Sequence, residues 1–247
     1  MRRITIGCLA VLVALALVGA AAAGTAFPTK RITYNICFNP GGESDITARF
    51  QEQALKKVLG QDIAIQYKIG GGGALCWADL IKAKPDGYTI AGHNLPHTVL
   101  QPLEMGNAGY NTLDLKQIYF FESTPNLLLV RTDSPFKTLK DFVEYAKKTP
   151  GAVTVGGSGT SSANDLGTTM LNKAAGIQLT YVPFGGTGSA VPALLGGHVS
   201  ALMSYSTMGI QYAGKFRALA IASEARMDVL ADVPTFKEQG YDVVEGA

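Results

Sequence analysis

The sequence has few side chains of the kinds that bind metals or nucleic acids. Its 247 residues include three histidines, His93, His97 and His198, and three cysteines. Lysine and arginine together number 21, and aspartate and glutamate 19, so the chain without Arg2 and Arg3 is formally neutral. There is no basic patch typical of nucleic-acid binding and no acidic tail typical of disorder. We therefore expect no nucleic-acid partner.

Motifs of nucleotide-binding and catalytic proteins are missing as well. The phosphate-binding pattern Gly-x-x-x-x-Gly-Lys-Ser/Thr does not occur. Ser158 lies in a glycine-rich stretch that departs from Gly-x-Ser-x-Gly at its last position. Leu95 and Pro96 separate His93 from His97, which argues against a metal-binding helix. We expect no metal, no cofactor and no enzymatic activity. The alternative is an exported hydrolase using Ser158, but no histidine is placed to act as its base.

The one long apolar run lies at the N-terminus. Arg2 and Arg3 precede the uncharged segment Ile4–Ala23, and small residues follow it up to Ala26. This order of charge, apolar core and small residues is typical of a secretory signal. We expect residues 1–26 to be a cleavable signal peptide, cut after Ala23 or Ala26. A retained membrane anchor is the alternative, because the run is long enough to span a bilayer.

Two cysteines remain after the predicted cleavage. Cys37 ends the first predicted strand and Cys76 opens the second predicted helix. Thiols of an exported protein can oxidise, so these two residues form either a disulfide or two separate buried thiols.

The rest of the chain alternates strand-like and helix-like segments. The clearest predicted strands are Arg31–Phe38, Asp62–Tyr67, Tyr88–Ala91, Leu115–Glu122, Asn126–Arg131, Val153–Gly156, Leu179–Val182, Val199–Met203 and Phe216–Ala222. The clearest predicted helices are Glu43–Leu59, Leu75–Ala83, Thr138–Lys148, Ser161–Ala175 and Ala190–Leu195. This alternation predicts an α/β fold with largely parallel sheets. No flexible linker is present, so a two-lobe chain would cross between lobes on the strands Leu115–Arg131 and Phe216–Ala222.

Four glycine-rich loops each follow a predicted strand and precede a helix. They are Asn39–Asp45, Ile69–Ala74, Gly156–Ser162 and Phe184–Ser189. In parallel α/β sheets such loops gather at the carboxyl edge, where ligands bind. Glycine lets the backbone approach a ligand closely, and helix N-termini present free N–H groups to an anion. The alternative for each loop is a tight turn that caps a helix. Four loops of similar placement favour an anion-binding site.

The order of short motifs resembles that of a known family. The motifs are Phe38–Gly42 followed by Asp45 and Arg49, Leu59–Gln61, Gly71–Gly73, Lys84–Thr89, Pro125–Asn126, Gly159–Ser162, Val182–Phe184, Leu194–Gly197, Lys215–Ala220 and Asp232–Thr235. In this order they resemble the periplasmic binding proteins of tripartite tricarboxylate transporters, the Bordetella uptake gene (Bug) or TctC family. The resemblance runs from the signal to the last residue.

The resemblance implies a two-lobe Venus-flytrap fold that binds a small carboxylate, such as a di- or tricarboxylate or an aromatic acid, between its lobes. It places lobe 1 at 27–125, lobe 2 at 126–218 and a return to lobe 1 at 219–247. The implied ligand-binding residues are Asn39, Gly41, Gly42, Ser44, Asp45, Gly72, Asn126, Ser158, Gly159, Thr160, Ser161, Ser162, Phe184, Gly185 and Ser204.

The resemblance also implies a periplasmic monomer that captures its ligand for membrane subunits of a tripartite transporter. A sensor that signals to a membrane kinase is the alternative. The family usually has aspartates where this chain has Ser200 and Ser204. The missing charge at Ser204 makes an amino-acid ligand less expected. Family members usually continue past Asp232–Thr235, so part of the first lobe is expected to be missing from a chain that stops at Ala247.

Overall fold

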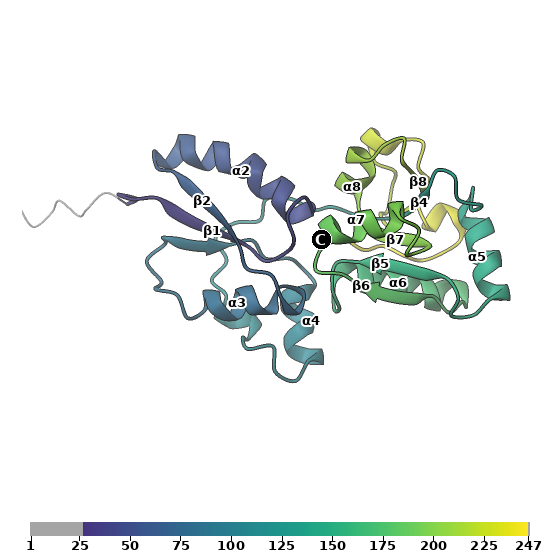
Figure 1. Cartoon of the computed structure of the whole chain (residues 1–247), viewed down its shortest axis with the longest axis horizontal. Helices are drawn as coiled ribbons and strands as arrows, with labels where there is room; N and C mark the ends of the chain where they lie inside the picture. The colour runs from purple at the N-terminus through teal and green to yellow at the C-terminus, as the bar shows by residue number, and fades with distance from the viewer. Residues whose placement is uncertain (1–26, 247) are drawn as a thin grey trace, which may run out of the picture.

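The computed structural model describes residues 27–246, which form two α/β lobes, each built around its own sheet (Figure 1). The predicted signal peptide lies outside the described residues. Within residues 27–246, no helix is both long and apolar enough to cross a membrane.

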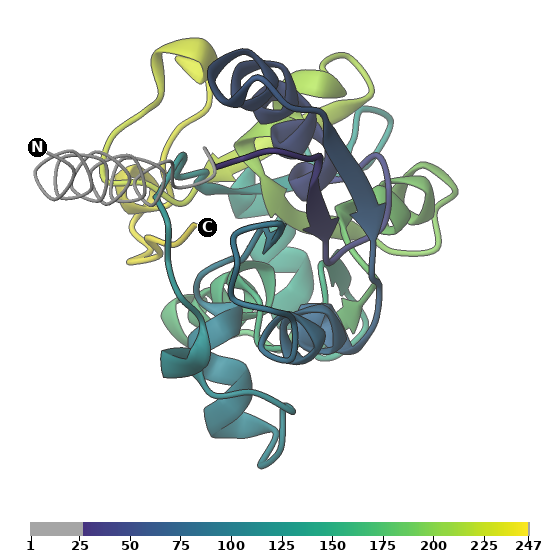
Figure 2. The ribbon, with the colours of Figure 1, turned by 90° about the vertical axis from the view of Figure 1, so that its left-hand side faces the viewer.

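Lobe 1 contains a three-stranded parallel sheet in the order β2-β1-β3. Its elements are β1 (Ile32–Ile36), α2 (Glu43–Leu59), β2 (Ile63–Tyr67), a 3-10 turn (Gly71–Gly73), α3 (Ala74–Leu80), β3 (Thr89–Ala91), α4 (His97–Glu104) and a 3-10 turn (Thr112–Asp114). Helices α2 and α3 cover opposite faces of the sheet (Figure 2).

Alternation along β1 explains this layering, because successive side chains of a strand point to opposite faces. Ile32, Tyr34 and Ile36 belong to the cluster under α2. Cys37, which follows the strand, belongs to the cluster under α3, together with Trp77.

Lobe 2 contains a five-stranded mixed sheet in the order β6-β5-β7-β4-β8. Its elements are β4 (Asn126–Arg131), α5 (Leu139–Lys148), β5 (Thr154–Gly157), α6 (Ala163–Ala175), β6 (Thr180–Pro183), α7 (Thr187–Leu195), β7 (Ala201–Tyr205), α8 (Ser206–Gln211) and β8 (Phe216–Ile221), followed by 3-10 turns at Asp228–Leu230 and Lys237–Gln239. Strand β4 runs antiparallel to both neighbours, and β5 runs parallel to β6 and β7.

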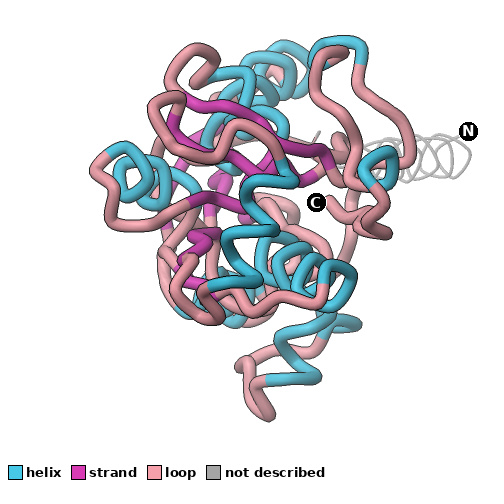
Figure 3. The backbone as a smooth tube through the Cα atoms, turned by 90° about the vertical axis from the view of Figure 1, so that its right-hand side faces the viewer, coloured by secondary structure: helices cyan, strands magenta, loops and turns pink. Residues whose placement is uncertain are grey.

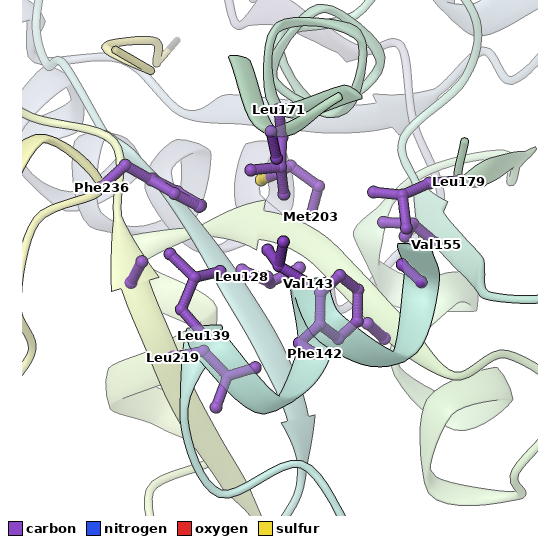
Figure 4. Close-up of a cluster of buried hydrophobic side chains, with 14 of the residues drawn as sticks. Leu128, Leu139, Phe142, Val143, Val155, Leu171, Leu179, Met203, Leu219 and Phe236 are labelled. Carbon is purple, nitrogen blue, oxygen red and sulfur yellow. The ribbon is translucent and has the colours of Figure 1, made fainter. Parts of the chain in front are cut away.

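The core of lobe 2 also follows from alternation. Leu128 and Val130 of β4 pack with α5 and α6, whereas Leu127 and Leu129 pack with α7 and α8 on the other face. Figure 4 shows the first cluster, with Phe142 of α5 lying close to Leu128. Helices therefore cover both faces of this sheet as well (Figure 3).

The two lobes are linked by residues 115–125, and here one prediction is wrong. Leu115–Glu122 is irregular and is not a strand. Its apolar run has the composition of a strand, but within residues 27–246 the segment forms no ladder with another strand, and β3 pairs there only with β1. Residues 92–114, which contain none of the clearest predicted elements, include the short helix α4, with Pro102 inside it.

The last described residues pack on lobe 2. Phe236 and Val243 lie in its core, and Gly246 forms an antiparallel bridge with Pro125. Strand β8 continues through position 218, the predicted boundary between lobe 2 and the segment that returns to lobe 1. The division into 27–125, 126–218 and 219–247 stays a prediction.

Cys37 and Cys76 are joined by a disulfide that ties the end of β1 to α3, with 5.2 Å between their Cα atoms. The bond closes a loop with a sequence separation of 39 residues. Cross-linking a loop of this length removes conformational freedom from the unfolded chain.

We predict that replacing both cysteines by serine lowers the free energy of unfolding by about 3–4 kcal/mol. Urea unfolding of the natural chain and the double variant measures the difference. A reductant should lower the midpoint of the natural chain and leave that of the variant unchanged. Equal midpoints without reductant would contradict the prediction.

Candidate functional site

The four glycine-rich loops, here called corners, meet in two pairs across the boundary between the lobes. The corner after β1 faces the corner that leads into α7, and the corner after β2 faces the corner that leads into α6. Each pair therefore joins one corner of lobe 1 to one corner of lobe 2. The sequence predicted that the corners share one edge, but it did not say how they pair.

The first pair is held by hydrogen bonds that two N–H groups of lobe 1 donate to lobe 2. The Asn39 N–H donates to the Gly185 carbonyl at 3.1 Å, and the Glu43 N–H donates to Thr187 Oγ1 at 2.8 Å. A Cβ on Gly188 would lie only 2.1 Å from the Pro40 carbonyl oxygen. Only a residue without a side chain fits at this position while the lobes are in contact.

The second pair is close as well, although less tightly packed. A Cβ on Gly159 would lie 3.0 Å from Gly72 Cα. Gln101 of α4 donates to the Gly72 carbonyl at 2.9 Å and so fixes the lobe 1 side. Across the boundary, the Ser161 hydroxyl donates to Glu104 at 2.5 Å.

The electrostatics of the corners come from the backbone. None of the four loops contains lysine or arginine. Helices α2, α6 and α7 all begin at the boundary, and the N-terminus of a helix carries a partial positive charge and unpaired N–H groups. Together with hydroxyls, such groups can hold a carboxylate without a cationic side chain.

A buried polar network shapes the α6 corner from behind. Asn164 Oδ1 accepts hydrogen bonds from the Ser158 N–H at 2.9 Å and from the Ser158 hydroxyl at 2.7 Å. The Asn164 amide donates to Asn126 Oδ1, and Asn126 donates to the Ala163 carbonyl. Tyr205 completes the network through the Ser158 hydroxyl. Asn126 and Ser158 thus support the corner rather than face the open boundary.

Some of the predicted hydroxyl groups already form hydrogen bonds within the protein. Ser162 caps α6 by accepting the Asp165 N–H at 3.0 Å. Ser161, with φ of 56°, bonds Glu104 as described above. Thr160 is exposed and Ser44 half-buried. Of the predicted hydroxyls, Thr160 and Ser44 are therefore best placed to meet a ligand.

Other predicted residues have structural partners. Asp45 accepts the Gly41 N–H at 2.8 Å and the Tyr67 hydroxyl at 2.7 Å, so it shapes the first corner. Phe184 packs against the α7 face of the lobe 2 core. Ser204 lies in β7 and is almost completely buried, and its hydroxyl has no hydrogen-bond partner among the described residues.

His97 was not predicted to take part in the site, yet it joins the two lobes. It is fully buried against Phe38 and Trp77, and its Nε2 lies 3.2 Å from the Ser158 carbonyl. Burial lowers the pKa of His97 to about 4, despite the opposing effect of this hydrogen bond. The imidazole is therefore neutral near pH 7, and Nε2–H donates to the carbonyl.

Glu43 is a second residue that the sequence analysis missed. Its side chain is buried at the start of α2 and contacts the Thr207 hydroxyl of lobe 2. Burial and repulsion by Glu122 raise the pKa of Glu43 to about 8, although a hydrogen bond from Thr124 lowers it. Asn164, Tyr205 and Thr187 were missed too, because their roles depend on contacts between distant segments.

A family model described as the tripartite tricarboxylate transporter family receptor matches residues 47–246. The chain belongs to this family. A UPF0065 protein of Agrobacterium vitis, from the TAR-I ttuE-ttuC' intergenic region, is 33% identical over 223 residues, which are 89% of this chain and 64% of the relative. BugT of Bordetella pertussis is 29% identical over 94% of this chain and 72% of its own length. The chain thus spans about two thirds of the length of the first relative.

Solved structures of this family share the fold. The periplasmic binding protein BugD is 29% identical, with a TM-score of 0.84 over 89% of this chain and 75% of BugD. MatC from Rhodopseudomonas palustris, solved with bound malate, is 32% identical with a TM-score of 0.82 over 89% of this chain and 76% of MatC. A further R. palustris protein, solved with adipate, is 25% identical with a TM-score of 0.78 over 89% of this chain and 76% of that protein. The predicted family and two-lobe fold are confirmed.

We predict that Asn164→Ala destabilises the protein by about 2–4 kcal/mol, because it leaves the buried Ser158 N–H and the Asn126 amide oxygen without partners. Urea unfolding measures the change. Asn107→Ala, an exposed amide in lobe 1, is the matched control and should cost less than about 1 kcal/mol. Equal effects of the two changes would contradict the role of the network.

We also predict a pH dependence that comes from Glu43. Because folding raises its pKa, the folded state holds this proton more tightly than the unfolded state, so stability falls as pH rises from the ordinary glutamate pKa toward about 8. Burial raises the pKa of Glu245 to about 7, which acts in the same direction.

Glu43→Gln should therefore gain about 2–4 kcal/mol relative to the natural chain between pH 5 and 8. Unfolding curves at four pH values measure this gain. The control is Glu224→Gln, which removes an exposed carboxylate of lobe 2 and should show no such trend. A Glu43→Gln curve parallel to the natural one would disprove the prediction.

Proposed function

We propose that this chain is an extracytoplasmic solute-binding protein that holds a small carboxylate between its lobes. The observation that carries the proposal is the meeting of four glycine-rich corners, two from each lobe, at the N-termini of α2, α6 and α7. A carboxylate there would receive N–H and hydroxyl donors from both lobes. Malate and adipate are the ligands of two solved relatives, which supports a dicarboxylate.

The proposed ligand-binding groups are those corner N–H groups that do not already donate to an acceptor within the protein, together with the hydroxyls of Ser44 and Thr160. Asn39, Gly42, Gly72, Gly159 and Gly185 shape the space by their close approach. Ser161 would hold the second pair of corners together through Glu104. The remaining predicted residues would support this shape from within each lobe; they are Gly41, Asp45, Asn126, Ser158, Ser162, Phe184 and Ser204.

Binding would act through closure of the lobes. A ligand that touches both lobes stabilises the closed arrangement more than the open one, and only this difference in affinity can shift the equilibrium. The closed form would then deliver its ligand to the membrane subunits of a tripartite transporter, as the family description supports. Export to the periplasm by the 1–26 signal and a monomeric state are parts of the same proposal.

Gly188→Ala tests whether closure is needed. Alanine is a good helix former at this position in α7, but its Cβ would collide with Pro40 once the lobes touch. We predict that the variant keeps its stability and loses at least about tenfold in affinity for dicarboxylates, equivalent to ~1.4 kcal/mol. Calorimetry with malate, adipate, citrate and glutamate measures affinity, and small-angle scattering measures compaction.

The matched control is Gly196→Ala at the other end of α7, where the added Cβ meets only the exposed His198 ring and its own helix. It should bind as the natural chain does. If Gly188→Ala bound dicarboxylates equally well, closure through this corner would be excluded. If the natural chain bound none of the four acids, the proposed ligand class would be wrong.

A further inference from the structure

Helix α4 lies on the side of lobe 1 that meets lobe 2 (Figure 1), and three of its polar side chains contact the glycine-rich corners. They are His97, Gln101 and Glu104, whose spacing of four and then three residues places them on one face of the helix. His97 and Gln101 are fully buried, whereas Glu104 is exposed. This face of α4 therefore lies along the second pair of corners.

Gln101, in the middle of this face, attaches α4 to lobe 1. Its amide group donates to the Gly71 carbonyl at 3.2 Å and to the Gly72 carbonyl at 2.9 Å. Its amide oxygen accepts the Tyr110 hydroxyl at 3.1 Å. We therefore expect α4 and the corner after β2 to move as one unit when the lobes open or close.

The residues on either side of Gln101 bond lobe 2. The His97 Nε2–H donates to the Ser158 carbonyl at 3.2 Å, and the Glu104 carboxylate accepts the Ser161 hydroxyl at 2.5 Å. In the sequence these two partners enclose Thr160, a proposed ligand-binding residue. Both bonds join groups of the protein only, so they can form in the closed arrangement before any ligand arrives.

Ser161 has a backbone conformation that is rare for serine. Its φ of 56° is positive, and among residues 27–246 it is the one residue other than glycine with such an angle. This conformation is unfavourable and persists where surrounding contacts hold it, often in segments that switch between conformations. Asp165 holds it within lobe 2 by accepting the Ser161 N–H at 3.0 Å, and Glu104 holds it from lobe 1.

From these contacts, we propose that His97 and Glu104 form a latch that holds the lobes together before a ligand binds. The latch rests on the proposed function, because it concerns closure around the same carboxylate site. The apparent dissociation constant is the intrinsic one divided by the fraction of molecules that are closed. A latch therefore tightens the binding of every ligand by the same factor, whereas a residue that touches the ligand changes the affinities for different acids unequally.

A repulsion between carboxylates acts against the latch. Burial and the nearby Glu104 raise the pKa of Asp165, although the hydrogen bond from the Ser161 N–H lowers it. An amide at position 104 would remove this repulsion and keep an oxygen that accepts the Ser161 hydroxyl, whereas alanine would remove both. Comparison of Glu104→Ala with Glu104→Gln therefore isolates the hydrogen bond.

The test measures the radius of gyration of the ligand-free, disulfide-bonded chain by small-angle scattering. Glu104→Ala should be more expanded than the natural chain, and Glu104→Gln should be as compact as the natural chain. Asp62→Ala, which removes an exposed carboxylate of lobe 1 that pairs with Lys56, is the matched control and should also be compact. An equal radius of gyration for Glu104→Ala and the natural chain would overturn the proposal.

Calorimetry with malate and adipate supplies a second measurement. Glu104→Ala should weaken the binding of both acids by the same factor, about three- to tenfold, as expected when one hydrogen bond between the lobes is lost. Glu104→Gln should restore the natural affinities. A loss of affinity for only one of the two acids would show that Glu104 contacts the ligand, which would refute the latch.

His97→Leu and His97→Gln repeat the comparison at the other end of the latch. Glutamine keeps an N–H donor for the Ser158 carbonyl, whereas leucine fills the apolar space beside Phe38 and Trp77 without one. Without ligand, His97→Leu should be expanded and His97→Gln compact, and a compact His97→Leu would equally count against the latch. Because His97 is fully buried, the exposed Glu104 decides the outcome if these variants fail to fold.

Failure of the latch and failure of the proposed function give different results. If the natural chain bound neither malate nor adipate, the proposed ligand class would be wrong, but the radius of gyration without ligand would still decide whether the latch exists. If both acids bound and Glu104→Ala stayed compact, the carboxylate site would stand and the latch would fall.

Discussion

The structure depends on the close approach of two bare stretches of backbone. Pro40 and Gly188 come so near each other that no side chain fits between them, and Gly72 and Gly159 make a looser backbone contact at the second pair of corners. A side chain at Gly188 would hold the lobes apart by steric repulsion alone. The glycines therefore serve the relation between the lobes as much as the turns in which they lie.

Each lobe holds its corners in place by a different set of contacts. In lobe 1, the disulfide from Cys37 to Cys76 and the packing of Phe38 and Trp77 around His97 fix the end of β1 against α3 and α4. In lobe 2, a buried network of amide and hydroxyl groups centred on Asn164 fixes the start of α6. Both arrangements reduce the conformational freedom of these loops, which would lower the entropy lost if they bind the proposed carboxylate.

The sequence predicted the layers well because alternating apolar residues specify which face of a strand is buried. Leu127–Val130 in β4 is an example, with one pair of side chains on each face. The loops were predicted because glycine is one of few residues that tolerate such turns. The segment 115–122 was predicted wrongly, since strand formation needs a partner chain and composition alone does not supply one.

The site was harder to predict than the fold. That the four loops share one boundary followed from the topology of parallel strands, but their pairing depends on how two separate lobes meet. Asn164, His97 and Glu43 could not be recognised, because each acts through a residue more than five positions away and no local pattern marks it. Ser158, which the sequence predicted as a ligand-binding residue, is buried beneath the surface of its corner.

The absence of lysine and arginine from the four loops has a consequence for selectivity. Long cationic side chains can follow an anion of almost any length, because they have many rotamers. N–H groups fixed at the starts of helices cannot move with the anion, so the distance between them would select acids by the separation of their carboxylates. A protein built in this way should distinguish acids by the spacing of their carboxylates more sharply than by their total charge.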